Sequence, residues 1–173
     1  KQTSFNAVAE LITAGHQEIA FLTGSMDSPT SIERLAGYKD ALAQHGIAFN
    51  EKLIANGKWT PASGAEGVET LLERGAKFSA LVASNDDMVI GAIKALHERG
   101  VAVPEQVSVI GFDDIAIAPY IVPALSSVKI PVTEMIQEII GRLIFMLDGG
   151  DFSPPKTFSG KLIRRDSLIA PSR

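Results

Sequence analysis

The sequence predicts an α/β fold in which a doubly wound, mostly parallel sheet is flanked by helices. Short apolar runs typical of strands alternate with longer stretches of helical periodicity. The run at residues 107–110 is rich in valine and isoleucine and lacks regular polar alternation, which is typical of a central strand covered on both faces. With 173 residues and no cysteine, the chain is long enough to bury a core without disulfides. We expect a flavodoxin-like or half-Rossmann arrangement.

The first elements are expected in the order helix, strand, helix. Apolar residues at helical spacing predict a helix at 5–14, with Ser4 as its N-cap. An apolar run predicts a strand at 18–23. Thr30 and Glu33 have the spacing of a capping box and predict that the next helix starts there and reaches residue 46. Residues 52–55 predict a weak strand.

The second half of the chain continues the alternation. Thr60 and Pro61 are suited to the cap and first position of a helix that ends near residue 75. Polar residues directly after a strand at 80–83 favour the start of a helix that runs to about residue 99. The remaining elements are expected as a strand at 107–111, a strand at 125–128, a helix at 131–147 and a last strand at 157–164.

Composition limits the classes of function. The net charge is −4 and basic residues are evenly scattered, so we expect no contact between this chain and nucleic acid. No apolar run is long enough to cross a bilayer, and the first residues enter a helix without a leader sequence. We therefore expect a soluble, cytoplasmic protein with no membrane contact. The abrupt helical start suggests a fragment of a longer chain.

Two helices carry more apolar surface than one-sided packing needs. In the helix at 86–99 the apolar residues cover more than one stripe, and we expect a partner surface there. The apolar residues of this helix are Met88, Val89, Ile90, Ile93 and Leu96. The helix at 131–147 is apolar nearly all round, so another structure must cover it.

Four residues are expected to meet at the carboxyl ends of the parallel strands, where open α/β sheets bind ligands. They are Arg34, Trp59, Asn85 and Asp113. A carboxylate accepts hydrogen bonds from hydroxyl groups, a guanidinium donates them, an amide does both, and an indole face packs on the C–H surface of a ring. The set is typical of a sugar site. Taken singly, each residue has an alternative role as a turn cap, a solvated charge or a core filler.

An enzymatic interpretation depends on two acidic pairs near strand ends, Asp86 with Asp87 and Asp113 with Asp114, which could bind Mg²⁺. Phosphate-binding and hydrolase motifs are absent from the sequence, and cysteine nucleophiles are excluded. The histidines do not form a metal set, and His16, His45 and His97 are expected at caps or on the surface. Arg164 and Arg165 could pair with these carboxylates or stay solvated. We expect no catalysis, no metal and no cofactor.

Six motifs resemble the LacI/GalR family of bacterial transcription regulators. They occur in the family's order and cover nearly the whole chain. The motifs are GHQEIAFLTG at 15–24, RLAGYKDAL at 34–42, SNDDMVIGAIKAL at 84–96, VSVIGFDDI at 107–115, LSSVKIP at 125–131 and LIRRDS at 162–167. The resemblance implies the type I periplasmic-binding-protein fold and the C-terminal part of the effector-binding core. The DNA-binding headpiece, the hinge helix and most of the N-terminal lobe would precede Lys1.

The resemblance also implies a division of the chain. Residues 1–127 would form the C-terminal lobe, 128–156 would cross to the N-terminal lobe, and 157–173 would return. Arg34, Asn85 and Asp113 match effector-contacting residues of the family, and Trp59 matches an aromatic residue that lines the sugar pocket in some members. At Ile130 some sugar-responsive members have a polar residue, so a hydrogen bond from this position is in doubt.

The resemblance implies a homodimer through the C-terminal lobe. The expected contacts are Val89, Ile90 and Ile93 in one helix and Ile117, Tyr120 and Ile121 in the segment after Asp114. Asp114 itself is expected to be a turn or hinge residue. The implied function is that of the effector-binding and dimerisation module of a repressor, with a sugar or glucoside as effector and operator DNA bound only through the missing headpiece. The alternatives are a periplasmic sugar-binding protein of a transport system and, less favoured, a Mg²⁺-dependent flavodoxin-like enzyme.

Overall fold

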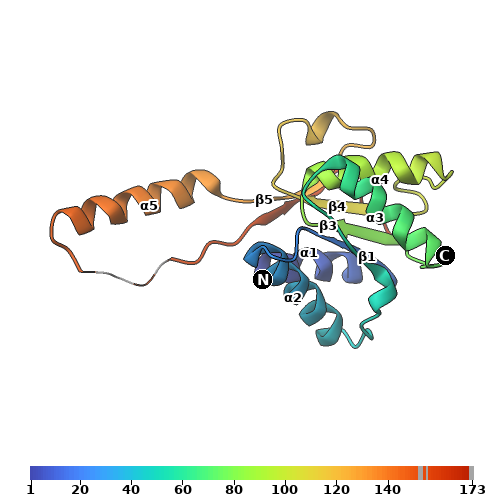
Figure 1. Ribbon diagram of the computed structural model, residues 1–173, viewed down its shortest axis with the longest axis horizontal. Coiled ribbons are helices and arrows are strands. Elements are labelled where there is room, and N and C mark those ends of the chain that lie inside the picture. Colours follow the sequence, from blue (N-terminus) through green and yellow to red (C-terminus); the bar gives the residue numbers. More distant parts are fainter. Residues whose placement is uncertain (152–153, 155, 172–173) are drawn as a thin grey trace.

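A computed structural model describes residues 1–151, 154 and 156–171, which form a six-stranded sheet with helices on both faces (Figure 1). The sheet order is β2 (Ile54–Asn56), β1 (Ile19–Thr23), β3 (Ala80–Ala83), β4 (Ser108–Phe112), β5 (Ser126–Lys129) and β6 (Lys161–Ile163). The first five strands of this order are parallel, and β6 runs antiparallel to β5. The predicted doubly wound, mostly parallel sheet is confirmed.

The helices form two layers around this sheet. One face carries α1 (Gln2–Thr13) and α2 (Pro29–Gln44), and the other carries α3 (Pro61–Glu73) and α4 (Asp86–Glu98). Alternate residues of β1 enter the two layers, since Phe21 packs with the α1–α2 side and Leu22 with the α3–α4 side. All residues of β1, β3 and β4 are buried, as expected for strands covered on both faces.

Close packing between α3 and α4 fixes the positions of their N-termini. A Cβ atom at Gly64 would lie 2.0 Å from the Met88 carbonyl oxygen, and one at Gly91 would lie 1.7 Å from that of Pro61. Only glycine fits at both positions. The loop before α3 and the loop before α4 are therefore held side by side at the carboxyl ends of the strands.

The predicted helix starts are confirmed for α3 and wrong for α1 and α2. The Thr60 hydroxyl accepts a hydrogen bond from the Ser63 amide at 3.2 Å, ahead of Pro61 at the first helical position. Helix α1 begins at Gln2, so Ser4 lies within it, and the Ser4 hydroxyl donates to the Arg34 carbonyl oxygen at 2.7 Å. Helix α2 begins at Pro29, whose fixed φ suits a first helical position, so Thr30 is not the cap.

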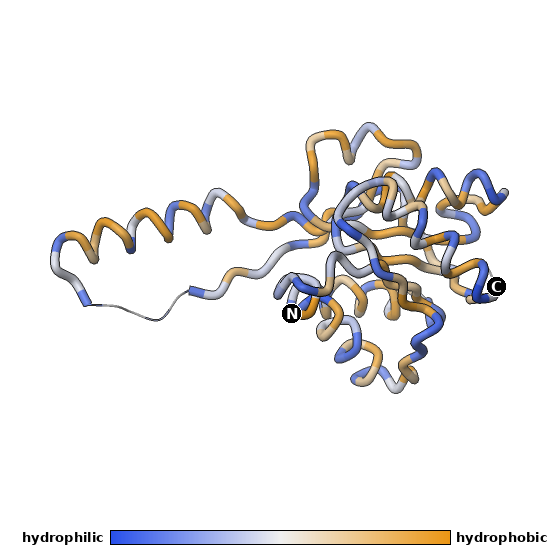
Figure 2. The backbone as a smooth tube through the Cα atoms, in the orientation of Figure 1, coloured by the Kyte–Doolittle hydropathy of each residue, from blue (hydrophilic) through white to orange (hydrophobic). Residues whose placement is uncertain are grey.

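Helix α5 (Val132–Leu147) projects away from the body of the molecule (Figure 1). None of its 16 residues is buried, and apolar positions recur along its whole length (Figure 2). Its exposed residues include Ile139, Leu143 and Leu147. The segment that returns from α5 includes residues 152–153 and 155, which, like 172–173, lie outside the described residues. Within the described chain no helix, α5 included, is long and apolar enough to cross a membrane.

Candidate functional site

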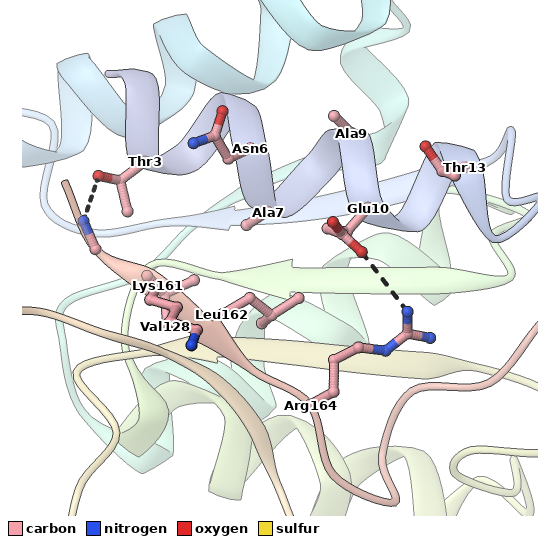
Figure 3. Close-up of a pocket in the computed structure, with 11 residues that line it drawn as sticks. Thr3, Asn6, Ala7, Ala9, Glu10, Thr13, Val128, Lys161, Leu162 and Arg164 are labelled. Atoms are coloured by element: carbon pink, nitrogen blue, oxygen red, sulfur yellow. Dashed lines mark hydrogen bonds and ion pairs between the residues drawn. The ribbon is translucent and has the colours of Figure 1, made fainter.

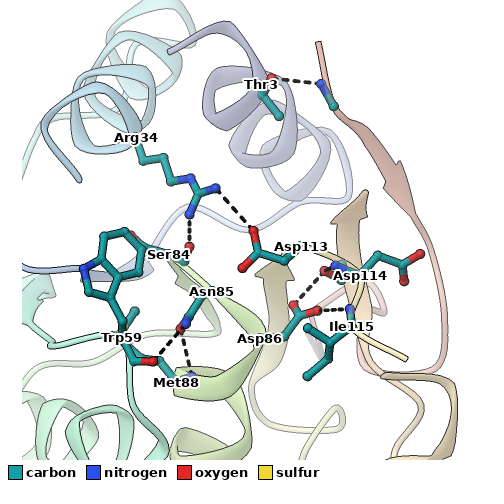
Figure 4. A network of polar contacts seen from close by, with 12 residues as sticks. Thr3, Arg34, Trp59, Ser84, Asn85, Asp86, Met88, Asp113, Asp114 and Ile115 are labelled. Carbon is teal, nitrogen blue, oxygen red and sulfur yellow. Dashed lines mark hydrogen bonds and ion pairs between the residues drawn. The ribbon is translucent and has the colours of Figure 1, made fainter. Parts of the chain in front are cut away.

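The four residues predicted at the strand ends lie together at one edge of the sheet (Figure 4). Arg34 stands on α2 after β1, Trp59 in the loop after β2, Asn85 two residues after β3, and Asp113 directly after β4. The convergence follows from the parallel sheet, because the carboxyl ends of its strands share one edge. This candidate site is defined below as Arg34, Trp59, Asn85 and Asp113.

Arg34 is the centre of the candidate site. One guanidinium nitrogen donates to the Ser84 carbonyl oxygen, and another lies 3.5 Å from a carboxylate oxygen of Asp113. The guanidinium carbon lies 4.4 Å from the ring centre of Phe112 and 5.9 Å from that of Trp59. Burial lowers the pKa of Arg34, while Asp113 opposes that shift. Arg34 is therefore a packed and paired cation rather than a solvated helix charge.

Asp113 presents the accessible anion of the candidate site. Its side chain is 45% exposed, against 14% for Arg34. Burial raises the pKa of Asp113, and the neighbouring Arg34 guanidinium lowers it. An accessible carboxylate beside a guanidinium can accept hydrogen bonds from hydroxyl groups while its partner donates them to hydroxyl oxygens.

Asn85 caps a helix and also bonds to the loop that carries Trp59. It caps α4, since its amide oxygen accepts from the Met88 amide at 3.0 Å. Its amide nitrogen donates to the Trp59 carbonyl oxygen at 3.0 Å. One N–H remains for a further acceptor, because the amide group carries two donors. Asn85 thus fixes the Trp59 loop against α4.

Trp59 lies in an unusual backbone conformation with φ of 66°. Its indole packs on Gly24, where a Cβ atom would come within 2.1 Å of the ring. Among the described residues only Trp59, Asp113 and Asp114 combine a positive φ with a side chain. Such conformations cost energy and persist where the surrounding structure holds them, often at functional sites.

The acidic residues do not form an open metal site. Asp86 is buried and accepts from the Ser127 hydroxyl at 2.6 Å and the Ile115 amide at 3.0 Å. Asp114 pairs with Arg165 at 2.7 Å. Of the part of the chain that is described, no group of three or more histidine, aspartate or glutamate side chains could hold a metal ion.

Other charged residues have ordinary partners. Arg164 forms an exposed pair with Glu10 at 3.6 Å, so only Arg165 reaches an acidic residue of the strand ends. The expectation of a surface or capping role is wrong for His16, which is 1% exposed. Its Nε2 donates to the Ile169 carbonyl oxygen at 2.9 Å, and its Nδ1 contacts the Ser79 hydroxyl at 2.8 Å. His16 joins the start of β1 to the last segment of the chain.

A pocket of about 370 Å³ adjoins the candidate site between α2, β4 and the start of α5. Of the four predicted residues only Arg34 lines it, together with Phe112, Ile130 and Met135. A second pocket, of about 470 Å³, lies between α1 and β6 and is crossed by the Glu10–Arg164 pair (Figure 3). Phe112 and Ser84 were not among the predicted site residues, although Phe112 ends β4 directly before Asp113 and Ser84 follows β3 directly before Asn85.

The residues predicted for dimerisation differ in accessibility. Ile117 and Tyr120 are exposed, at 54% and 81%, and Ile90, Ile93 and Ile121 are half-buried. Val89 is fully buried in the core and has no surface for a partner. Part of the apolar width of α4 is covered within the chain, because α4 packs against both the sheet and α3. Val122, which follows Ile121 in the same segment, is 89% exposed.

The chain is similar to known transcription regulators. The periplasmic binding protein-like domain matches residues 8–168. The HTH-type transcriptional regulator AscG of Escherichia coli (strain K12) is 96% identical over 173 residues, which are 100% of this chain and 52% of that protein. The chain thus spans about half the length of this relative.

Solved structures agree with this similarity. A sugar-binding transcriptional regulator of the LacI family from Escherichia coli, complexed with phosphate, has a TM-score of 0.94 at 96% identity, covering 98% of this chain and 61% of that chain. The transcriptional regulator CelR in complex with cellobiose has a TM-score of 0.90 at 32% identity, covering 96% of this chain and 51% of that chain.

These relatives are regulators and not enzymes, and they favour neither a transport protein nor a Mg²⁺-dependent enzyme. The periplasmic-binding-protein-like fold expected from the motifs is confirmed. The chain belongs to the periplasmic binding protein-like domain family, among the LacI/GalR-type transcriptional regulators.

Proposed function

We propose that this chain is the effector-binding core of a LacI/GalR-type transcriptional repressor and that its effector is a small sugar or glucoside. The observation that carries the proposal is the Arg34–Asp113 pair at the carboxyl edge of the sheet, with the Trp59 indole beside Arg34 and the Asn85 amide bonded to the Trp59 backbone. The similarity to a sugar-binding regulator and to a cellobiose complex supports this class of ligand. The chain binds its ligand without catalysis or cofactor.

Each residue of the candidate site has a defined role in this proposal. The Asp113 carboxylate accepts hydrogen bonds from sugar hydroxyls, and Arg34 donates to hydroxyl oxygens. The free N–H of Asn85 donates a further bond. The Trp59 indole packs on the C–H face of the sugar ring. The arrangement is chemically suited to an uncharged polyol.

The sugar site is completed by a second lobe in a longer protein. Residues 1–127 and 157–173 form one lobe, and the segment 128–156 with α5 belongs to the other. Two observations support this division: the bare apolar surface of α5, and the span of about half the relative's length. Sugar binding shifts the population of two lobe arrangements and thereby alters DNA affinity. A separate headpiece contacts operator DNA, and the protein acts in the cytoplasm.

A thermal-shift comparison tests both the ligand class and the division into lobes. Cellobiose and D-glucose are added to the 173-residue chain and to a longer protein that contains it with the upstream residues. We expect sugar to raise the melting temperature of the longer protein and to leave that of this chain alone almost unchanged, because a ligand stabilises only the state that binds it. An equal shift in both proteins would show that the second lobe is dispensable. A shift with amino acids but with neither sugar would contradict the ligand class.

A further inference from the structure

Asp86 is a buried carboxylate beside the candidate site, and its side chain is not accessible to a ligand. It is the first residue of α4, and its side chain is 0% exposed. Its two carboxylate oxygens have different partners. One accepts from the Ser127 hydroxyl of β5 at 2.6 Å, and the other from the Ile115 amide at 3.0 Å (Figure 4). Asp86 therefore joins α4, β5 and the turn after β4.

The turn that Asp86 contacts is the one that presents Asp113. Asp113 and Asp114 have φ values of 102° and 52°, which side-chain-bearing residues seldom adopt. The Asp113 amide donates to the Val128 carbonyl oxygen at 2.9 Å, and the Asp114 amide donates to the Ser127 hydroxyl at 3.0 Å. A conformation of this kind persists only where neighbours hold it.

The hydrogen-bond directions require a carboxylate at position 86. The Ser127 oxygen accepts from the Asp114 amide, and its own proton is donated to Asp86. The Ile115 amide can only donate. Asp86 must accept at both oxygens. Asparagine has the same shape but one oxygen, so its NH₂ group would face a donor.

The strand below provides space for this carboxylate. A Cβ atom at Gly111 of β4 would lie 2.0 Å from an Asp86 carboxylate oxygen. Burial, with smaller contributions from the charges of Asp113 and Asp114, raises the pKa of Asp86 to about 6 against the hydrogen bonds from Ser127 and Ile115. A group that is costly to ionise but accepts two bonds beside a binding site is better explained by that site than by stability.

We propose that Asp86 is a positioning residue for effector binding. Its two oxygens hold the turn at Asp113 and Asp114 in the left-handed conformation that directs the Asp113 carboxylate to Arg34. The assignment rests on the proposed sugar site. Asp86 acts through the turn and does not touch the sugar.

The first test concerns the turn itself and needs no ligand. Asp86→Asn is compared with Asp87→Asn, which removes an equal charge from the next, exposed position of α4. We expect the Ile115 amide of the 173-residue chain to exchange with deuterium about tenfold faster in Asp86→Asn, equivalent to one lost hydrogen bond. The three-bond amide coupling of Asp114, which reports φ, should change as well. Both quantities should stay unchanged in Asp87→Asn, and an unchanged turn in Asp86→Asn would overturn the proposal.

The second test concerns affinity, with cellobiose as probe in the longer protein. Asp86→Asn should weaken binding tenfold or more without a matching fall in melting temperature, and Asp87→Asn should bind as the wild type. If Asp86→Asn does not fold, Ser127→Ala replaces it, because it removes the same bridge and should cause the same loss.

A third variant, Asp113→Ala, separates the two claims. Loss of binding in Asp113→Ala with wild-type binding in Asp86→Asn or Ser127→Ala would overturn the role of Asp86 alone. Wild-type binding in Asp113→Ala would instead contradict the proposed sugar site. Loss in Asp113→Ala together with loss in Asp86→Asn supports both.

Discussion

At the scale of single residues, the candidate site is held by backbone groups as much as by side chains. Arg34 donates to the Ser84 carbonyl oxygen and Asn85 to that of Trp59. These bonds fix the groups that would otherwise move on long side chains, so little conformational entropy is lost when a ligand arrives. The unusual φ values of Trp59 and Asp113 lie at the same place.

His16 gives a prediction on pH. Burial lowers the pKa of His16, opposed by its hydrogen bond to the Ile169 carbonyl oxygen. The unfolded chain then binds a proton near pH 6.5, before the folded chain does. His16 therefore contributes stability above pH 6.5 that is lost as the pH falls below it. We expect the melting temperature to fall more steeply between pH 7.5 and 5.5 in the wild type than in His16→Gln.

The wild type must be compared with His16→Gln because Asp86 changes the stability with pH in the direction opposite to that of His16. Its pKa is raised to about 6, so below pH 6 the folded chain gains a proton and is stabilised. Because both proteins contain Asp86, subtracting the melting-temperature curve of His16→Gln from that of the wild type removes the contribution of Asp86. His97→Gln, at an exposed position of α4, is the matched control and should follow the wild type. Identical slopes for His16→Gln and the wild type would contradict the role of His16.

The sequence predicted which residues meet at the site but not how they are held. The four positions follow from the rule that parallel strand ends share an edge. The left-handed conformation of Trp59 has no sequence signal, because tryptophan seldom adopts it. The choice of Arg165 rather than Arg164 as the partner of Asp114 depends on a strand of three residues whose register the sequence does not specify.

At the scale of elements, the periodicity of the sequence predicted the bounds of the helices and strands well. It predicted less well which elements pack against each other. The strand at Ala80–Ala83 and the helix at Val132–Leu147 lie close to their predicted bounds. The second apolar stripe of α4 is covered by α3, at the close approach of Gly64 and Gly91. A hydrophobic pattern indicates that a face is buried but does not identify what buries it.

The surface around the short helix Ala118–Tyr120 gives an element-scale prediction. It carries exposed Ile117, Tyr120 and Val122, and we propose it as the homodimer contact, together with Ile90, Ile93 and Ile121. Tyr120→Glu places a charge in this apolar surface, which an interface core disfavours. We expect the longer protein to sediment as a dimer and the variant to shift toward the monomer. Ala43→Glu, at an exposed position of α2 on the other face of the sheet, should leave sedimentation unchanged. An unshifted Tyr120→Glu dimer would place the interface elsewhere.

At the scale of the whole molecule, the chain has two unlike parts. The sheet and four helices have a continuous buried core on each face, whereas α5 has no buried residue. The apolar pattern of α5 indicates only that a cover is needed, and the expectation that residues 128–156 cross to another lobe came from the family resemblance rather than from the pattern. We attribute the cover to the second lobe, whose other side would also close over Asp113.

The affinity of the longer protein for a sugar, with and without the Asp113 carboxylate, tests the central claim most directly. The measurement is a calorimetric titration with cellobiose of the wild type, of Asp113→Ala, and of Asp166→Ala as the control at an exposed aspartate. A site built to bond hydroxyl groups loses much of its affinity when a buried partner is left unpaired. We expect Asp113→Ala to bind at least about a hundredfold more weakly, equivalent to about 2.7 kcal/mol, and Asp166→Ala to bind as the wild type. Equal affinities of all three proteins would contradict a sugar site at Asp113.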